Sequence, residues 1–542
     1  MTAMTGKTTP DPMPTPLPQI TTLARSGALD RAWGLFCEGG YLSATHNAAA
    51  LAVKGRLLKD RALISHGHER VVLMADAIAA YAAANAIDPQ PWLLLNVATL
   101  SLLAGNPDQA RHYADAVLAE IAPGQAVSET PYFLAATRSE ALLLKGDIAG
   151  ADAMLEAARA ADPDGWSDHA TTLRHFRLIV GAQGGSLDWL DTHRPPRSAH
   201  FAGHLGVDPD DCADLRAEID GILATQTIGF GYGALAAGAD IVIAESLLAR
   251  GGELHVVLPA EEPEFFRQSV APFPGWAARY RACLDAAHSL TIATQTKGAF
   301  EPLATALAAE RAMGAAALNA RLLESEAVQI LVIDDGDGPW GGGKHTARDG
   351  EVWRRALKAQ AIVIAPRRVS VPPSGSRNEG RTDLGLAALL HVRFDGVDGL
   401  GDADFSEAVD TLIAPTRHAM MGMPNGPVRD MPCGNARLLQ FEDVAAAAHF
   451  AHALHALDPP DGWGKTPLTL VAHYGLVHRI GDMIAGPAIA GLSAFLPATP
   501  GGTLTLSAAF AHAYAIVAGP EVRMPVVGDA GGEPLHALCV MG

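Results

Sequence analysis

The sequence predicts a multidomain protein with an all-α helical repeat, then an α/β domain with a Rossmann-like parallel sheet, then an α+β domain. Three observations predict this order. Residues 19–190 have helical patterning throughout, residues 197–368 alternate short apolar strands with helices, and residues 385–542 follow a mixed order. Prolines mark both junctions, at 191–197 and in the linker 369–384, because proline cannot continue a helix.

Length, charge and cysteine usage limit the function classes. At 542 residues the chain exceeds the size at which one hydrophobic core keeps growing. A formal charge of −19, with no basic run longer than Arg367–Arg368, disfavours nucleic-acid partners. The cysteines form no CxxC pair and no metal-ligand spacing, so we expect reduced thiols in a cytoplasmic protein with no metal or other cofactor: Cys37, Cys212, Cys283, Cys433 and Cys539.

Two segments indicate whether the chain is exported or inserted into a membrane. Residues 1–18 are rich in proline and threonine and lack the apolar core of a signal peptide, which predicts a disordered arm. The stretch between Asp482 and Glu521 carries no charge, but Pro487, Pro497 and Pro500 divide it into pieces shorter than the roughly 20 residues of a spanning helix. We expect a buried strand, helix and strand there, and no membrane partner.

A recurring join divides the helical segment. Leu23–Ala32, Leu102–Ala110 and Leu143–Ala151 each place a glycine five residues before an alanine, at the turn between two amphipathic helices. Small residues at such turns let paired helices approach, and stacked pairs bury a continuous core. The pattern resembles a tetratricopeptide-type array with irregular periods.

Two further segments extend that resemblance. Gly55–Arg61 and Glu129–Arg138 are similar to the TRAFs-binding-like helical region of bacterial signalling proteins, and to the regulatory region of apoptosis-signal-regulating MAP kinase kinase kinases. The resemblance implies a sensor role or the docking of protein partners rather than chemistry. The alternative for Arg56, Lys59, Asp60 and Arg61 is a solvated helix face.

The middle segment predicts a parallel sheet covered on both faces, because strands alternate with helices. Its expected strands are Ser198–Ala202, Glu253–Leu258, Leu290–Thr294, Val328–Asp334 and Ala361–Ala365, and its expected helices are Pro209–Ala224, Ala234–Ala249, Leu303–Glu324 and Val352–Ala359. Ligands of such sheets bind outside the carboxyl ends of the strands. Three loops are expected to meet there: Gly203–His204, the turn Gly229–Gly233, and Asp334–Lys344.

The turn at Gly229, Gly231 and Gly233 precedes a small-residue helix, and this arrangement predicts an anion site. Glycines let the backbone approach a ligand, and a helix N-terminus offers free N–H groups and partial positive charge. The spacing is not the GxGxxG of dinucleotide sites. Residues 338–344 match GxxxxGK, which adds Gly343 and Lys344 as candidates, but His345 stands where a phosphate-loop ATPase has Ser or Thr.

The first strand, the following GYGALAAGADIVIAE segment and the VVLP strand together resemble a Rossmann-like nucleotide-sensing domain of the SLOG or LOG kind. The resemblance implies that glycines around Tyr232 contact the phosphate of a nucleotide-derived ligand, while Asp240 and Glu245 line the pocket floor. The alternatives are structural. Asp240 caps a helix turn, Glu245 pairs with Arg250, and the glycines serve helix–sheet packing.

The last segment is α+β, with expected strands at Leu386–Phe394, around Gly434, at Thr469–His473 and at Thr503–Leu506, and expected helices at Phe405–Ala414, Ala445–Leu457, Pro487–Ala494 and Ala508–Val517. Phe441–Val444, His473–Val477 and Pro500–Gly502 resemble landmarks of the class III adenylate/guanylate cyclase catalytic domain. Because that domain pairs head to tail, the resemblance implies a homodimer as one candidate assembly.

The active-site positions depart from the cyclase pattern. The family's two metal-binding aspartates, purine-selecting lysine, and transition-state asparagine and arginine fall on Arg393, Asn435, Met431, Ala490 and Ala494 respectively. A cation cannot ligate Mg²⁺, and alanine offers nothing to a developing phosphoryl charge. A small shift of register would bring Asp395 nearer to the first position but would not restore the other roles.

These observations predict a non-catalytic signalling protein. The helical repeats and the pseudo-cyclase domain would dock partners, and the central domain would bind a nucleotide-derived ligand. Three alternatives are weighed against it: a nucleotide or NAD hydrolase acting through Glu245 or Asp240, an active nucleotide cyclase, and an interaction scaffold with no ligand.

Overall fold

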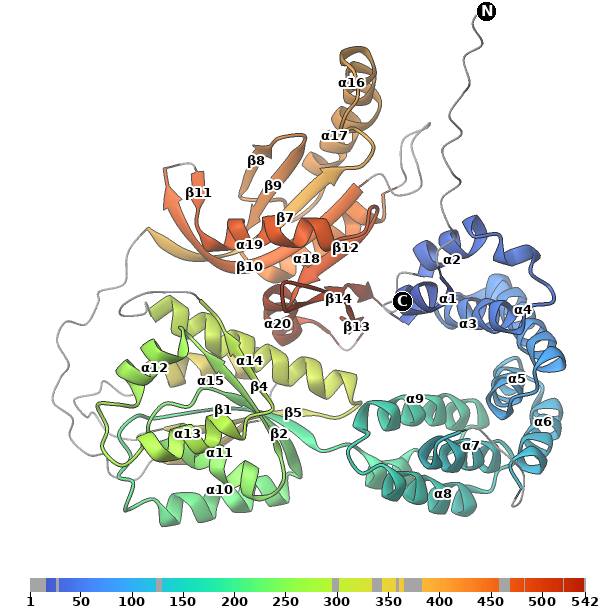
Figure 1. Cartoon of the computed structure of the whole chain (residues 1–542), viewed down its shortest axis with the longest axis horizontal. Helices are drawn as coiled ribbons and strands as arrows, with labels where there is room; N and C mark the ends of the chain where they lie inside the picture. The colour runs from blue at the N-terminus through green and yellow to red at the C-terminus, as the bar shows by residue number, and fades with distance from the viewer. Residues whose placement is uncertain are drawn as a thin grey trace, which may run out of the picture. The chain divides into compact units, whose positions relative to one another are not determined.

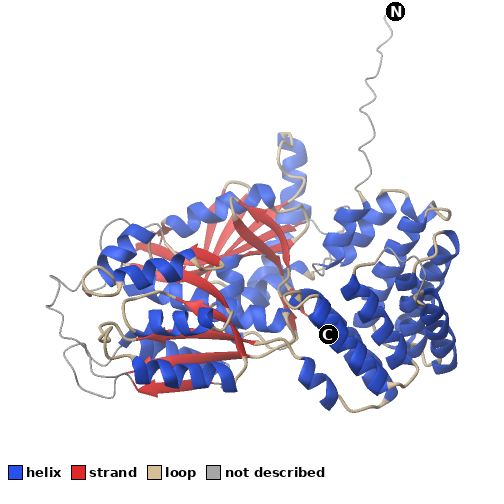
Figure 2. Ribbon diagram, turned by 60° about the horizontal axis from the view of Figure 1, so that its bottom comes forward, coloured by secondary structure: helices blue, strands red, loops and turns tan. Residues whose placement is uncertain are grey.

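The computed structural model describes residues 16–25, 29–122, 129–294, 302–333, 344–356, 360–364, 383–457, 468–481, 483–519 and 521–540. The chain forms two compact units, divided between Arg194 and Pro195. Figure 1 follows the chain from blue to red, and Figure 2 colours it by secondary structure. The division lies close to the predicted end of the repeat region at residue 190.

In its described residues, the first unit is helical apart from turns and loops (Figure 2). Its α-helices are α1 (Leu17–Arg25), α2 (Leu29–Glu38), α3 (Ala48–Ile64), α4 (Gly67–Ile87), α5 (Pro91–Leu103), α6 (Pro107–Glu120), α7 (Pro131–Leu144), α8 (Ile148–Ala161) and α9 (Trp166–Gln183). Helices α3 and α4, α5 and α6, and α7 and α8 pack as pairs. The predicted helical-repeat fold is confirmed.

Two of the predicted joins share one helix-ending geometry. Gly105 after α5 and Gly146 after α7 both have a positive φ, of 84° and 86°. The N–H of Asn106 donates to the carbonyl of Ser101, and the N–H of Asp147 donates to that of Leu142. This is the Schellman arrangement, which favours glycine because its backbone enters the left-handed region without a Cβ clash. The third join, at Gly27, lies outside the described residues.

Helix α4 is the one described helix that is long and apolar enough, by length and composition, to cross a membrane. Its Met74, Ala77 and Tyr81 are buried in one cluster with residues of α3 and α5. Gly55 of α3 permits this packing, since a Cβ there would lie 2.9 Å from the Tyr81 ring. Packing in the helical stack therefore accounts for part of the apolar character of α4, while Val71 and Val72 of the same helix are exposed.

The second unit contains the predicted parallel sheet. Its strands are β1 (Arg197–Gly203), β2 (Ile228–Gly233), β3 (Glu253–Leu258), β4 (Ser289–Ile292), β5 (Ala327–Ile333) and β6 (Gln360–Ile364), all parallel in the order β4-β3-β2-β1-β5-β6. Helices α10 (Ala213–Thr225), α11 (Ala239–Ala249) and α13 (Ala277–Asp285) lie along one face, and α14 (Pro302–Leu322) and α15 (Lys344–Ala356) along the other (Figure 1). The short α12 (Glu262–Ser269) and α13 were not predicted.

Three predictions in this domain are wrong. Gly229, Gly231 and Gly233 form no turn, because they lie within strand β2. The following helix begins at Ala239 rather than Ala234, after a connection that contains Gly238 at a φ of 131°. Helix α15 also starts eight residues before the predicted Val352, at Lys344.

A second sheet, mainly antiparallel, follows in the same unit. Its strands run in the order β14-β15-β12-β10-β7-β9-β8, with β11 beside β10. Their bounds are β7 (Leu384–Phe394), β8 (Arg429–Cys433), β9 (Ala436–Phe441), β10 (Leu468–Ile480), β11 (Met483–Ala485), β12 (Leu504–Ser507), β14 (Val526–Ala530) and β15 (Glu533–Ala537), with a separate pair β13 (Val522–Arg523) and β16 (Cys539–Val540). The hairpin of β14 and β15 was not predicted.

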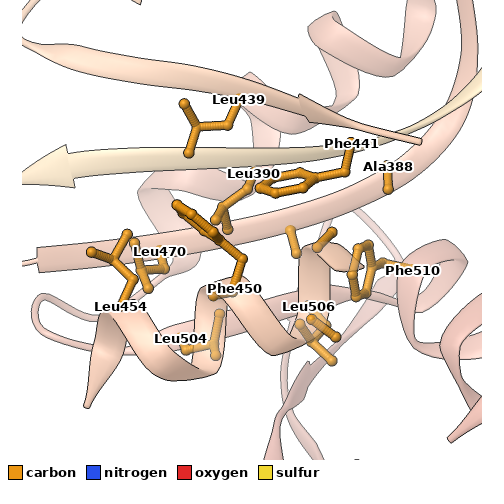
Figure 3. Close-up of a cluster of buried hydrophobic side chains, with 14 of the residues drawn as sticks. Ala388, Leu390, Leu439, Phe441, Phe450, Leu454, Leu470, Leu504, Leu506 and Phe510 are labelled. Atoms are coloured by element: carbon orange, nitrogen blue, oxygen red, sulfur yellow. The ribbon is translucent and has the colours of Figure 1, made fainter. Parts of the chain in front are cut away.

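Helices cover both faces of this second sheet. They are α16 (Asp402–Ala408), α17 (Ala414–Gly422), α18 (Val444–His455), α19 (Pro487–Phe495) and α20 (Ala508–Val517), and a π-helical turn at Val409–Ile413 joins the first two. Phe441, Phe450 and Phe510 fill the core against α18 and α20 (Figure 3). A smaller cluster that includes Leu389 and Leu492 lies under α19.

Helix α14 contacts both sheets of the second unit. It lies along β1, β2, β3 and β5 of the parallel sheet and also packs on α20. Its Ala317 belongs to the core cluster of the second sheet. At Gly314 the two helices touch backbone to backbone, because a Cβ there would overlap the carbonyl group of His512. A small residue at this position is therefore a condition for the two sheets to pack.

We predict that Gly314→Ala destabilises the second unit by about 1–3 kcal/mol, since overlap with backbone cannot be relieved by rotating a side chain. Gly221→Ala on α10 is the matched control. Nothing lies within 4 Å of a Cβ at that position, so removing a helix-interior glycine should be neutral or stabilise by about 0.5–1 kcal/mol. Urea unfolding followed by circular dichroism measures both. Equal stability of Gly314→Ala and the wild type would contradict the packing argument.

Candidate ligand site at the sheet edge and the cyclase-like positions

The order of the parallel sheet reverses between β1 and β5, and at such switch points α/β proteins bind ligands beyond the carboxyl ends of the strands. Gly203 ends β1 and His204 follows it, as predicted for this edge. Gly343 lies outside the described residues, and Lys344 is the first residue of α15. The described part of the edge is thus formed by the end of β1 and the first turns of α11 and α15.

Asp240 is buried in the first turn of α11. Its carboxylate accepts hydrogen bonds from the backbone N–H groups of Gly203, at 2.7 Å, and Ala236, at 3.1 Å. The N–H of Ala239 donates to the carbonyl of His204 at 3.2 Å. These three amide groups are satisfied within the chain. The carboxylate of Asp240 therefore binds backbone N–H groups that were predicted to bind an external anion. This contact is closer to the predicted alternative, in which Asp240 caps a helix turn, than to a residue that lines a pocket.

The edge holds a second buried carboxyl group, that of Asp349 in α15. Burial raises the pKa of Asp349 to about 7, although the Arg348 guanidinium opposes the rise. Burial also raises the pKa of Asp240 to about 7, and the negative charge of Asp349 adds to that rise. Two interacting carboxyl groups that change protonation near neutral pH mark this edge as a candidate functional site. Asp349 escaped prediction because it lies before the expected start of its helix.

The predicted glycines support close helix–sheet packing. A Cβ at Gly203 would overlap Ala239 of α11, and a Cβ at Gly231 would overlap Leu247 of the same helix. In the same way, a Cβ at Gly229 would overlap Pro196, and a Cβ at Gly233 would overlap Phe201. The space beside each of these glycine Cα atoms, where a Cβ would lie, is filled by protein atoms. Contact between these glycines and a phosphate remains a prediction.

Tyr232 is buried in β2 and stacks on His255 of β3, with ring centroids 4.5 Å apart and planes 6° from parallel. Burial raises the pKa of Tyr232, and the charge of Glu253 raises it further, so the phenol keeps its proton. His255 Nδ1 lies 2.8 Å from Ser289 Oγ of β4. These contacts hold Tyr232 in the body of the sheet.

Glu245 is the middle of an ion-pair cluster between three helices. Its carboxylate pairs with Arg216 of α10 and accepts hydrogen bonds from Arg279 of α13 at 2.7 and 2.8 Å. Burial alone would raise its pKa, but the bonds and charges of the two arginines outweigh it and lower the pKa. The expected alternative partner, Arg250, is replaced by these two. A carboxylate held this firmly in its charged form is poorly suited to act as a general acid or base.

In the second sheet, Arg393 near the end of β7 bonds to the carboxylate that follows the strand. Arg393 Nε donates to Asp395 Oδ1 at 3.1 Å. The other oxygen of Asp395 accepts from Thr469 Oγ1 at 2.6 Å and from the Gly502 N–H at 2.8 Å. The two oxygens of Asp395 are thus engaged by donors, and a cation stands beside them where a metal-binding aspartate was expected.

The other cyclase-like positions offer little to a metal or a phosphate. Asn435, in the turn between β8 and β9, donates to Asp398 at 3.2 Å. Ala490 and Ala494 lie on the exposed side of α19, and Met431 lies on β8. Within the described ranges, no group of three or more His, Cys, Asp or Glu side chains is placed to hold a metal ion.

No protein-family model and no curated protein matches this chain. Solved structures match parts of it at low TM-scores. The adenylyl cyclase CyaB from P. aeruginosa is 14% identical over 29% of this chain and 96% of its own, with a TM-score of 0.22. The tetratricopeptide-repeat proteins YrrB (14% identity, 32% of this chain, 88% of its own, TM-score 0.20) and TTC0263 from Thermus thermophilus (18%, 31%, 97%, 0.21) also match. No functional conclusion follows at such scores.

The raised pKa values predict a pH dependence that Asp349→Asn should reduce. A carboxyl group that titrates near pH 4 when unfolded and near 7 when folded binds its proton more tightly in the folded state. Its contribution to stability is therefore lost as pH rises from about 4 to 7, at up to about 1.4 kcal/mol per pH unit. Urea unfolding at pH 5 and pH 8 should show Asp349→Asn more stable than the wild type at pH 8, with a smaller difference at pH 5.

The control for this experiment is Glu218→Gln, which neutralises an exposed carboxylate on α10. Its stability difference from the wild type should change little between the two pH values. A pH profile of Asp349→Asn that parallels the wild type would show that Asp349 is not the group responsible.

Proposed function

We propose that the chain is a non-catalytic signalling protein. In this proposal the helical repeats dock a protein partner, the carboxyl edge of the parallel sheet receives a nucleotide-derived ligand, and the cyclase-like domain serves association instead of catalysis. The observation that carries it is the bond between Arg393 and Asp395 at the end of β7.

The chemistry of cyclisation explains why this bond matters. Mg²⁺ binds to hard, negatively charged oxygens, and phosphoryl transfer depends on metal ions and cations that neutralise the developing charge. Asp395 instead accepts hydrogen bonds from Arg393, Thr469 and the Gly502 N–H. Exposed Ala490 and Ala494 supply no donor to a phosphate. This arrangement supports a domain that keeps its fold and has lost its reaction.

Polar contacts between the first helices of successive pairs support docking by the repeats. Lys59 of α3 donates to Asn96 of α5 at 3.0 Å, and Thr99 of α5 donates to Glu140 of α7 at 2.7 Å. His175 of α9 lies 3.6 Å from the same glutamate. These polar groups form a row across four helices, in which Glu140 is buried and His175 is partly exposed. Stacked repeats form extended binding faces, so the exposed part of this row is a candidate for contact with a partner. The row also favours a role for Lys59 beyond a solvated face.

The first test is an assay for cyclic nucleotides. Purified full-length protein incubated with Mn²⁺ and ATP or GTP should form no cAMP or cGMP above a protein-free blank. Asp395→Asn, which removes one candidate metal ligand, serves as the control and should be equally silent. Product formed by the wild type and lost in Asp395→Asn would establish an active cyclase in place of our proposal.

The second test concerns the ligand. A ligand that binds only the folded state stabilises it by about 2.7 kcal/mol at 100 times its Kd. We therefore expect at least one nucleotide or dinucleotide, from a panel that includes ATP, GTP and NAD, to raise the melting temperature of the wild type without being consumed. No shift with any of them would favour the scaffold alternative, and consumption of the ligand would favour the hydrolase.

A further inference from the structure

Glu310 joins three elements of the second unit that lie far apart in sequence. It is buried on α14 and accepts a hydrogen bond from Arg348 of α15 on one carboxylate oxygen. The other oxygen accepts from the hydroxyl of Tyr474, on strand β10 of the second sheet, at 2.8 Å. Burial and the charge of Glu310 raise the pKa of Tyr474, so the phenol remains a donor. A single carboxylate thus connects the parallel-sheet domain to the centre of the cyclase-like sheet.

On the side of the parallel sheet, Arg348 is shared between two carboxylates. Its Nη1 lies 3.5 Å from Asp349 Oδ1, while its Nη2 bonds to Glu310. The carbonyl of Asp349 accepts from Gln329 of β5 at 3.2 Å, which fixes this turn of α15 on the sheet. A change of charge at Asp349 therefore changes how strongly Arg348 is drawn toward the edge or toward Glu310.

On the other side, β10 carries the connection onward. Tyr474 pairs with Ala388 of β7, and five residues earlier on the same strand Thr469 donates to Asp395. One strand therefore holds both the contact to Glu310 and the contact to Asp395. Gly314, one turn along α14 from Glu310, fixes the distance between the two domains by its contact with His512.

We propose that Arg348, Glu310 and Tyr474 form a relay that transmits changes at the carboxyl edge of the parallel sheet to strand β10 of the cyclase-like domain. This inference rests on the proposed function, in which ligand binding at the carboxyl edge of the parallel sheet must affect the domain that docks partners. Its residues are positioning residues. Coupling of this kind requires that two arrangements of Arg348 differ in the contacts that they make with β10.

The test is a double-mutant cycle on the full-length protein, read by amide hydrogen exchange with mass spectrometry. Asp349→Asn changes the charge at the edge, and Tyr474→Phe removes one hydroxyl from the relay. We expect Asp349→Asn to change exchange rates in the 468–480 segment by about fivefold or more, the lower end of typical coupling. In the Tyr474→Phe background the same substitution should change them by less than about twofold.

Two further variants control for general loosening. Tyr514→Phe removes a buried phenol hydroxyl from α20 outside the relay, and the Asp349→Asn effect on β10 should persist in its background. Glu310→Gln should abolish the effect as Tyr474→Phe does. Additive changes in the cycle, or no change in β10 on Asp349→Asn, would overturn the relay. The proposed function is judged separately by the cyclic-nucleotide and melting assays, so the two can fail independently.

Discussion

The backbone contact of α14 with α20 at Gly314 is the constraint on which the second unit depends. Only a residue without a Cβ lets the helices touch there, and α14 is buried against both sheets as a result. This explains its sequence. A helix buried all round cannot show an amphipathic stripe, and PLATALAAERAMGAAALNARL shows small residues on every side. The charged groups within it, Glu310, Arg311 and Arg321, have partners on neighbouring segments.

The same logic of burial governs the carboxyl edge of the parallel sheet. Asp240 satisfies two backbone N–H groups, but the burial that makes this possible also favours the neutral form of its carboxyl group. Two effects also oppose each other at Asp349, because burial favours its neutral form whereas the charge of Arg348 favours its ionised form. The edge is therefore held by groups whose charge responds to small changes in their surroundings. The free backbone N–H groups that the sequence predicts for this edge would not change their charge in this way.

Much of the order of strands and helices was predictable because many of these elements follow a local hydrophobic period. Helix Ala508–Val517 and strand Glu253–Leu258 were placed to the residue. The glycines from Gly229 to Gly233 were misplaced because glycine suits a turn and a crowded strand equally. Their neighbours Pro196, Phe201 and Leu247 come from other segments and are not visible in the local pattern. The partners of Glu245 and Glu310 come from segments 29 to 164 residues away, a separation that no local pattern encodes.

In the second sheet, strand β10 takes part in two separate sets of side-chain contacts. At the end of β7, Arg393 and Thr469 both donate hydrogen bonds to Asp395, and Arg393 also donates to Thr469, so side-chain contacts hold this corner of the sheet. Five residues beyond Thr469 on the same strand, Tyr474 donates across the domain boundary to Glu310. One strand thus contacts Glu310 of the adjoining domain and Asp395 of its own sheet, and this is the connection that the proposed relay requires.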